Sequence, residues 1–172
     1  KRVVVTPFFR DHFARLDRQI VLVDCLSALN VGPECVQDMQ EALTLILKSF
    51  SYGKSGILTR LFRPKIDRVL FAATKADHVT PNQYHNLELF LRRLVTEARN
   101  EIQFQGIETE CLALASVRAT EPAVAEFQGQ KISCLRGIRD SDKTLVALFP
   151  GEVPTEIPAA SDWHDRFNFI DF

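Results

Sequence analysis

The sequence predicts an α/β domain with a mainly parallel sheet covered by helices in a three-layer arrangement. Three apolar runs of strand length alternate with two segments of helical periodicity, which gives the order strand–helix–strand–helix–strand. Short apolar strands separated by helices form parallel sheets through right-handed crossovers. A chain of 172 residues, 46% of them hydrophobic, is long enough to bury one such core, so residues 1–172 are expected to form a single domain.

The first predicted strand is Gln19–Asp24, a continuous apolar run that ends in a carboxylate. Such a run is typical of a strand that is buried on both faces of the sheet. A helix is expected to follow Gly32, with Pro33 at its first position. Its apolar stripe recurs at helical spacing and consists of Val36, Met39, Leu43, Ile46, Leu47 and Phe50.

The second strand is predicted over Asp67–Thr74, and the second helix begins with a capping-box variant at Thr80-Pro81-Asn82-Gln83. This helix is long and is expected to end at Gly106. The third strand is predicted over Glu110–Ala115. The buried face of the long helix is expected to contain Leu87, Leu91, Leu94, Val95, Ala98 and Ile102.

Beyond residue 120 the alternation of strands and helices ends. A β-hairpin insertion is predicted over about 124–136, with Gly129 in its turn, followed by a polar loop over Gly137–Lys143. The aromatic tail Trp163–Phe172 is expected to pack back onto the domain. An irregular tail is predicted over about 150–172, where regular structure is disfavoured by Pro150, Pro154 and Pro158.

Charge and composition exclude some classes of partner. The net charge of −1 gives no argument for nucleic acid, and no apolar run approaches the roughly 18 residues that span a bilayer. A local basic segment over Lys54–Arg68 is interpreted as a solvated face. The cysteines lack paired C-x-x-C spacing and are expected to be reduced, which favours a cytoplasmic location; they are Cys25, Cys35, Cys111 and Cys134.

The segment Val69–Asp77 reads as a buried strand followed by a T-K-x-D box, the guanine-recognition element of P-loop GTPases. The carboxylate of Asp77 can accept two hydrogen bonds from N1–H and the amino group of guanine, whereas adenine has no donor at N1. The methylene stem of Lys75 can lie along the base while its ammonium group stays hydrated. Thr74, Lys75 and Asp77 are therefore candidate base-binding residues, and the alternative is an ordinary capping loop.

Asp24 and Ser116 also follow predicted strands, and ligands bind at the carboxyl ends of parallel strands. An acid in the position of Asp24 holds Mg²⁺ directly or through water in P-loop enzymes, and the alternative is a cap on the following turn. Such an acid is usually followed three residues later by glycine, where this chain has Ser27. Ser116 and Val117 lie where many GTPases place a backbone amide against the guanine carbonyl.

The sequence Gly53-Lys54-Ser55 ends like a phosphate-binding loop, but that loop requires a glycine where this chain has Lys48. The preceding residues are helical in pattern, with no strand to begin the loop. The histidines form no recognised constellation, so no catalytic residue is assigned from the sequence; they are His12, His78, His85 and His164.

Several longer segments together resemble the YcjX family, bacterial P-loop NTPases associated with stress responses. They are Phe9–Phe13, Leu16–Leu26, Leu70–Val79 and Pro150–Pro154. The similarity extends from about residue 8 to the end, and it implies a P-loop NTPase-like fold. It also implies a larger protein, whose phosphate-binding loop and first strand lie upstream of Lys1.

Within that family, Thr74, Lys75 and Asp77 correspond to the base-recognition box, and Asp24 corresponds to the magnesium-side acid. Arg10-Asp11-His12 matches a segment before the Asp24 strand where GTPases keep mobile switch elements. No catalytic role is assigned to it.

The resemblance and the box together predict a cytoplasmic hydrolase that binds GTP or GDP with Mg²⁺. This chain alone is expected to be inactive, because the upstream loop supplies most of the affinity for a triphosphate. Two alternatives stay open. One is an ATP-preferring enzyme of the same fold, and the other is a nucleotide-free module that docks an unidentified protein partner through the basic segment.

Overall fold

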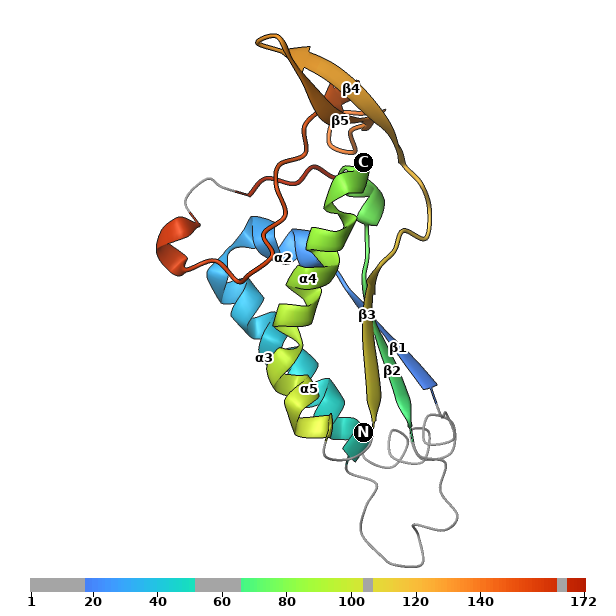
Figure 1. Ribbon diagram of the computed structural model, residues 1–172, viewed down its shortest axis with the longest axis vertical. Coiled ribbons are helices and arrows are strands. Elements are labelled where there is room, and N and C mark those ends of the chain that lie inside the picture. The colour runs from blue at the N-terminus through green and yellow to red at the C-terminus, as the bar shows by residue number, and fades with distance from the viewer. Residues whose placement is uncertain (1–17, 52–65, 104–106, 164–166) are drawn as a thin grey trace, which may run out of the picture.

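The computed structural model describes residues 18–51, 66–103, 107–163 and 167–172. In these ranges the chain forms two sheets of three strands each. Figure 1 shows helices packed beside the first sheet, and the second sheet lies beyond one end of the first.

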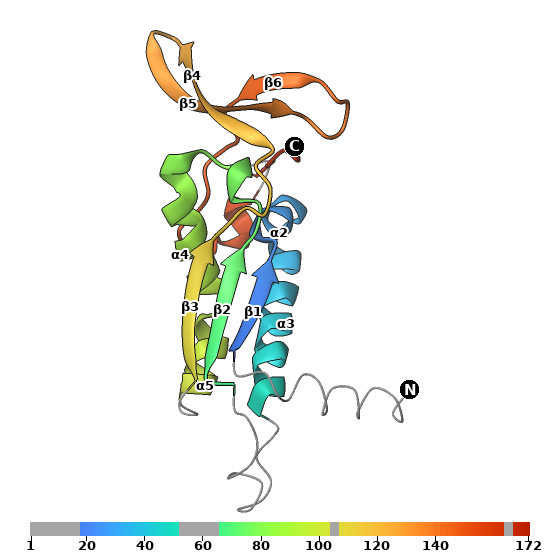
Figure 2. The same ribbon diagram turned by 90° about the vertical axis from the view of Figure 1, so that its right-hand side faces the viewer.

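The first sheet is parallel and follows the order of the chain. Its strands are β1 (Arg18–Val23), β2 (Arg68–Ala73) and β3 (Glu108–Ala113), with β2 in the centre. The register runs without a slip from the first residue of each strand to its last, so the three carboxyl ends lie side by side (Figure 2). The three predicted strands are confirmed, and β3 begins and ends two residues earlier than expected.

Four described helices cover the first sheet: α2 (Cys25–Val31), α3 (Pro33–Ser51), α4 (Tyr84–Leu94) and α5 (Thr96–Gln103). They lie on one face of it, and the core forms between them and the inward side chains of the strands (Figures 1 and 2). The described residues therefore form two of the three predicted layers. Burial of β1 on both faces was a wrong expectation, since Ile20 and Leu22 alternate outward and are 65% and 64% exposed.

The helices begin where local sequence signals allow a helix start, but the capping box expected at Thr80 is an exception. Pro33 begins α3 as expected, and the sequence missed α2, which Asp24 caps. The capping box at Thr80 does not form, because the hydroxyl of Thr80 accepts from the side chain of Gln83 instead of from the backbone. A short 3₁₀ turn (Pro81–Gln83) precedes α4.

The predicted long second helix is divided in two. Val95 separates α4 from α5 with a φ of −95° and a ψ of 3°, away from the helical region. Five of the six expected buried positions nevertheless face the core, being at most 1% exposed: Leu87, Leu91, Leu94, Val95 and Ala98. The side chain of the sixth, Ile102, lies outside the described part of the structure. Gly106 lies outside the described residues.

The second sheet is antiparallel and consists of β4 (Thr120–Phe127), β5 (Gln130–Ile138) and β6 (Leu145–Leu148). The predicted hairpin is confirmed, and its turn places Gln128 and Gly129 at positive φ. It is longer than expected, because β5 continues into the predicted polar loop. The sequence also missed β6, which has only four residues.

The C-terminal tail packs back onto the core, as predicted from its aromatic residues. Trp163, Phe167 and Phe169 are all less than 10% exposed, and Phe167 and Phe169 stack on each other. The indole of Trp163 donates to the carbonyl of Leu29 at 3.0 Å. Gln83 holds the start of the tail, donating to the carbonyl of Gly151 and accepting from the amide of Val153.

All four cysteines are free thiols, and burial is the first cause that raises the pKa of Cys25 and of Cys111. Among the described helices, none combines the length and the apolar character needed to cross a bilayer. Most of the basic segment lies outside the described residues, and Arg68 at its end is ion-paired with Glu108 at 3.1 Å.

Two leucines on α3 allow a matched test of this packing. Leu47 is fully buried, whereas Leu45 is 66% exposed. Leu47→Ala is expected to lower the free energy of unfolding by about 2–5 kcal/mol through the cavity that it leaves. Leu45→Ala should change it by about 0.5 kcal/mol or less. Denaturant unfolding of both variants checks the assignment, and equal losses would contradict the orientation of α3.

Candidate functional site

The T-K-x-D box lies at the carboxyl end of the central strand and is tied to both neighbouring strands. The amide of Thr74 donates to the carbonyl of Val23 at 2.9 Å, and the hydroxyl of Thr74 lies 3.4 Å from the same oxygen. On the other side, the amide of Ala76 donates to the carbonyl of Leu114 at 3.1 Å. The loop is therefore fixed between the ends of β1 and β3.

Asp77 lies in a 3₁₀ turn (Ala76–His78) and is only 7% exposed. Its Oδ2 accepts a hydrogen bond of 2.7 Å from the amide of Ala119, and its carbonyl accepts from the hydroxyl of Thr120. No described residue donates a hydrogen bond to Oδ1, and the imidazole of His78 lies 4.0 Å away. Buried carboxylate oxygens normally have partners, so Oδ1 has capacity for a donor from a ligand.

Lys75 has an unusual backbone conformation for a residue with a side chain. Its φ of 58° and ψ of 34° lie in the left-handed region, which residues other than glycine rarely adopt outside turns and functional sites. Its ammonium group lies 2.7 Å from Oδ1 of Asp171 and 3.0 Å from Oδ2 of Asp24. The hydrogen bond to Asp171, opposed by burial and supported by Asp24, raises the pKa of Lys75.

Asp24 caps α2 at the carboxyl end of β1. Its Oδ1 accepts from the amide of Ser27 at 3.0 Å, and its Oδ2 accepts from the hydroxyl of Ser27 at 2.8 Å. Burial alone would raise the pKa of Asp24, but the hydrogen bonds from Ser27, and then the ammonium of Lys75, hold the pKa below its ordinary value. Both oxygens thus have partners within the protein.

The described residues do not by themselves complete a Mg²⁺ site. Among them no group of three or more His, Cys, Asp or Glu side chains could hold a metal ion. In nucleotide sites Mg²⁺ is held by one or two carboxylates together with phosphate oxygens and water. A lysine ammonium group already neutralises Asp24. The assignment of Asp24 as a magnesium-side acid stays a prediction, and the geometry seen here is that of a helix cap and an anchor for Lys75.

Ser116 and Val117 lie in the connection between β3 and β4, next to the box but not bonded to it. Val117 is 73% exposed, and no described hydrogen bond joins either residue to Thr74–Asp77. The residues that contact Asp77 from this connection are instead Ala119 and Thr120. Sequence reasoning missed both. The backbone amide of Ala119 has no signature in the residue type, and the hydroxyl of Thr120 reaches Asp77 only through tertiary packing.

A second group of residues missed by the sequence comes from the end of the chain. Asp171 reaches Lys75 as described above, and its carboxylate lies 3.7 Å from Nδ1 of His78. The ring of Phe172 meets His78 edge-on, with ring centroids 5.5 Å apart. Only the general expectation that the tail packs back could have suggested these contacts.

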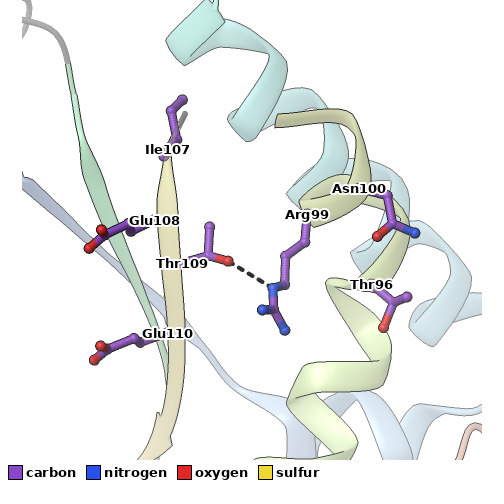
Figure 3. A pocket seen from close by; sticks show the side chains of 7 residues that line it. All are labelled: Thr96, Arg99, Asn100, Ile107, Glu108, Thr109 and Glu110. Atoms are coloured by element: carbon purple, nitrogen blue, oxygen red, sulfur yellow. Dashed lines mark hydrogen bonds between the residues drawn. The ribbon is translucent and has the colours of Figure 1, made fainter. Parts of the chain in front are cut away.

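A surface groove lies at the opposite end of the sheet (Figure 3). There the guanidinium of Arg99 on α5 donates to the hydroxyl of Thr109 on β3 at 2.7 Å. The side chains of Glu108 and Glu110 point away from Arg99. Since ligands of parallel sheets bind at the carboxyl ends of the strands, this groove is not the candidate site. Its other lining residues are Thr96, Asn100 and Ile107.

Two sequence segments considered above cannot be placed. Arg10-Asp11-His12 and Gly53-Lys54-Ser55 both lie outside the described residues.

Comparisons with known proteins agree with the sequence resemblance. A family model described as "YcjX-like family, DUF463" matches residues 1–172. A protein of Escherichia coli K12 named "Ras-like GTPase YcjX" is 49% identical over 170 residues, which is 98% of this chain and 37% of that protein. A protein of the same name from Shewanella oneidensis MR-1 is 43% identical over 170 residues, 98% of this chain and 35% of that protein. The chain thus spans little more than a third of the length of these relatives.

The cap on α2 is open to a direct test. Asp24→Ala removes the acceptor for Ser27 and should lower the free energy of unfolding by about 0.5–2 kcal/mol. Asp24→Asn keeps an acceptor at the cap position and should lose less. Thermal and denaturant unfolding at neutral pH would compare the two variants, and an alanine variant as stable as the wild type would exclude the cap.

The lowered pKa of Asp24 predicts a dependence of stability on pH. A carboxyl group whose folded pKa lies below its unfolded value of about 3.9 stabilises the fold above that pH, and the contribution is lost as the pH falls through the folded pKa. The difference in stability between the wild type and Asp24→Asn should therefore be present at pH 7 and shrink below about pH 4. A difference that stays constant down to pH 2 would contradict this prediction.

Proposed function

The chain belongs to the YcjX-like family, and from this premise we propose that it carries the guanine-recognition part of a P-loop NTPase that hydrolyses GTP. The two relatives are named as Ras-like GTPases, and the family model matches the whole chain. The phosphate-binding loop is proposed to lie upstream, in the part of the longer protein that this chain does not span. This chain alone would then bind nucleotide weakly and would not hydrolyse it.

The observation that carries the proposal is the buried Oδ1 of Asp77, which receives no hydrogen bond from a described residue. Guanine offers two adjacent donors, N1–H and the exocyclic amino group, to a carboxylate in this position. Oδ2 keeps its bond to the amide of Ala119 and still has acceptor capacity, because an ionised carboxylate offers about four lone-pair sites. Adenine would present an acceptor to the same oxygens, which supports a preference for guanine over the ATP-preferring alternative.

Lys75 is proposed to lie along the face of the base. The left-handed backbone at Lys75 turns its side chain toward the ends of β1 and α2, where the ammonium group contacts Asp24. The methylene stem would contact the purine while the charge stays paired. Ser116 and Val117 are proposed to approach the guanine carbonyl from the β3–β4 connection, which Leu114 holds beside the box.

Mg²⁺ would supply charge neutralisation at the phosphates, and its ligands are proposed to come chiefly from upstream residues, with Asp24 as the contribution of this chain. No described residue is assigned a catalytic role. The buried free thiols fit a reducing compartment, which supports the proposed cytoplasmic location.

Removal of the Asp77 carboxylate tests base recognition. In the protein extended upstream to the length of its relatives, Asp77→Ala is expected to weaken GDP binding by about 2–4 kcal/mol, because guanine donors lose a charged acceptor. Isothermal titration calorimetry measures the change, and denaturant unfolding in parallel checks the lost bond to Ala119. Unchanged affinity would remove Asp77 from the site.

A second variant at the same position is expected to gain affinity for a different base. Asp77→Asn offers an amide donor, and xanthine has a carbonyl where guanine has its amino group. The variant should therefore bind xanthosine diphosphate more tightly than the wild type does, and GDP more weakly. A folding defect cannot produce such a gain, so its absence in the same titration would count against the proposed geometry.

A further inference from the structure

The end of the chain lies across the loop that contains Lys75 and Asp77. The amide of Asp140, after β5, donates to the carbonyl of Asp171 at 2.9 Å and fixes the backbone of the tail there. From that position the carboxylate of Asp171 reaches the ammonium of Lys75 at 2.7 Å. Both views of the molecule show the C-terminus beside the carboxyl ends of the parallel strands (Figures 1 and 2).

The ring of Phe172 packs against His78 and β5 next to the box. It meets the imidazole of His78 edge-on, and its Cδ1 and Cε1 atoms lie against β5 at Gly137. A Cβ atom on Gly137 would lie 2.7 Å from Cδ1 of Phe172, so the ring occupies space that any residue with a side chain would fill. The contact therefore depends on a glycine at this point of β5.

The tail is anchored in the core a few residues before this contact. The side chain of Asn30 donates to the carbonyl of Phe169 and accepts from its amide, both at 2.7 Å. The rings of Phe167 and Phe169 are buried. This anchor at Phe169 does not involve Asp171 or Phe172, so it is independent of their contacts with the box.

The contacts of the tail use groups that a base would need. Asp77 and His78 are each only 7% exposed, although they follow the carboxyl end of a strand where a ligand would enter. The ammonium of Lys75 is held by Asp171, and His78 is covered by Asp171 and Phe172. A purine that contacts Asp77 and lies along Lys75 has to share this space with Asp171 and Phe172 or displace them.

We infer that Asp171 and Phe172 act as an intramolecular competitor of the guanine base, so that this end of the chain must move from the box when nucleotide binds. The inference rests on the proposed function, because it assigns regulation to the same site. The contact lowers the apparent affinity for nucleotide in proportion to the fraction of molecules in which the box is free of the tail.

The test uses the protein extended upstream and measures its affinity for GDP by calorimetry. Asp171→Asn removes the negative charge that pairs with Lys75 and should tighten GDP binding by about two- to fivefold, the range expected for loss of one exposed ion pair. Phe172→Ala removes the contact with His78 and should act in the same direction. Glu156→Gln is the matched control, because Glu156 is a tail acid of similar exposure, 65% against 63% for Asp171, that pairs with Arg93 away from the box, and it should leave the affinity unchanged.

A second readout needs no variant. In the wild type, the amide of Asp140 is held by the carbonyl of Asp171, and its hydrogen–deuterium exchange should become faster when GDP is added, because the tail leaves the box. If GDP binds and this amide stays equally protected, base and tail coexist and the inference is overturned.

The outcomes separate the inference from the proposed function. GDP binding that is equal or weaker in Asp171→Asn overturns the competing tail and leaves the guanine site intact. No GDP binding by the wild type or by any variant overturns the proposed function, and the inference with it, because the tail then has no base to displace.

Discussion

The site depends on the backbone hydrogen bonds that fix the loop after β2 between its two neighbouring strands. Thr74 is bonded to the end of β1, and Ala76 is bonded to Leu114 beyond the end of β3. These bonds are possible because the three strands are parallel and in register, so their carboxyl ends are level. The short loop then has little freedom, and Lys75 adopts a left-handed conformation while Asp77 turns inward. A base-recognition loop needs this kind of preorganisation, because an acceptor that moves loses its preference for one base.

Charge is balanced around Lys75 by residues distant in the sequence. Asp24 comes from the end of β1 and Asp171 from the tail, and the same lysine contacts both. Because Asp24 also caps α2, the helix, the strand end and the lysine are coupled through one carboxylate. Removal of Asp171 leaves the cap and the Asp24 pair in place. The tail contact is therefore the replaceable part of this network, and the Asp24 contact is the structural part.

Much of the fold could be predicted from the sequence, because apolar periodicity reports which residues face a core. The three strands, the start of α3 at Pro33 and the hairpin turn at Gly129 were predicted correctly from local patterns. The break in the helix at Val95 and the exposure of Ile20 and Leu22 could not be predicted from the sequence, because they depend on which other elements pack against these residues. For the candidate site, the residue types directed attention to the box and to Asp24, whose binding roles stay predictions. Ala119 and Asp171 were missed, because their contacts with Asp77 and Lys75 arise only from tertiary packing.

The central claim is that the level strand ends present a loop selective for guanine. The most direct test is a pair of calorimetric titrations, GDP and ADP in the presence of Mg²⁺, into this chain and into the protein extended upstream to the length of its relatives. The account predicts that the extended protein binds GDP at least about a hundredfold more tightly than ADP, because adenine leaves the buried oxygen of Asp77 without a donor. This chain alone should bind both weakly. Equal affinity for the two nucleotides, or tighter binding of ADP, would contradict the role given to the loop.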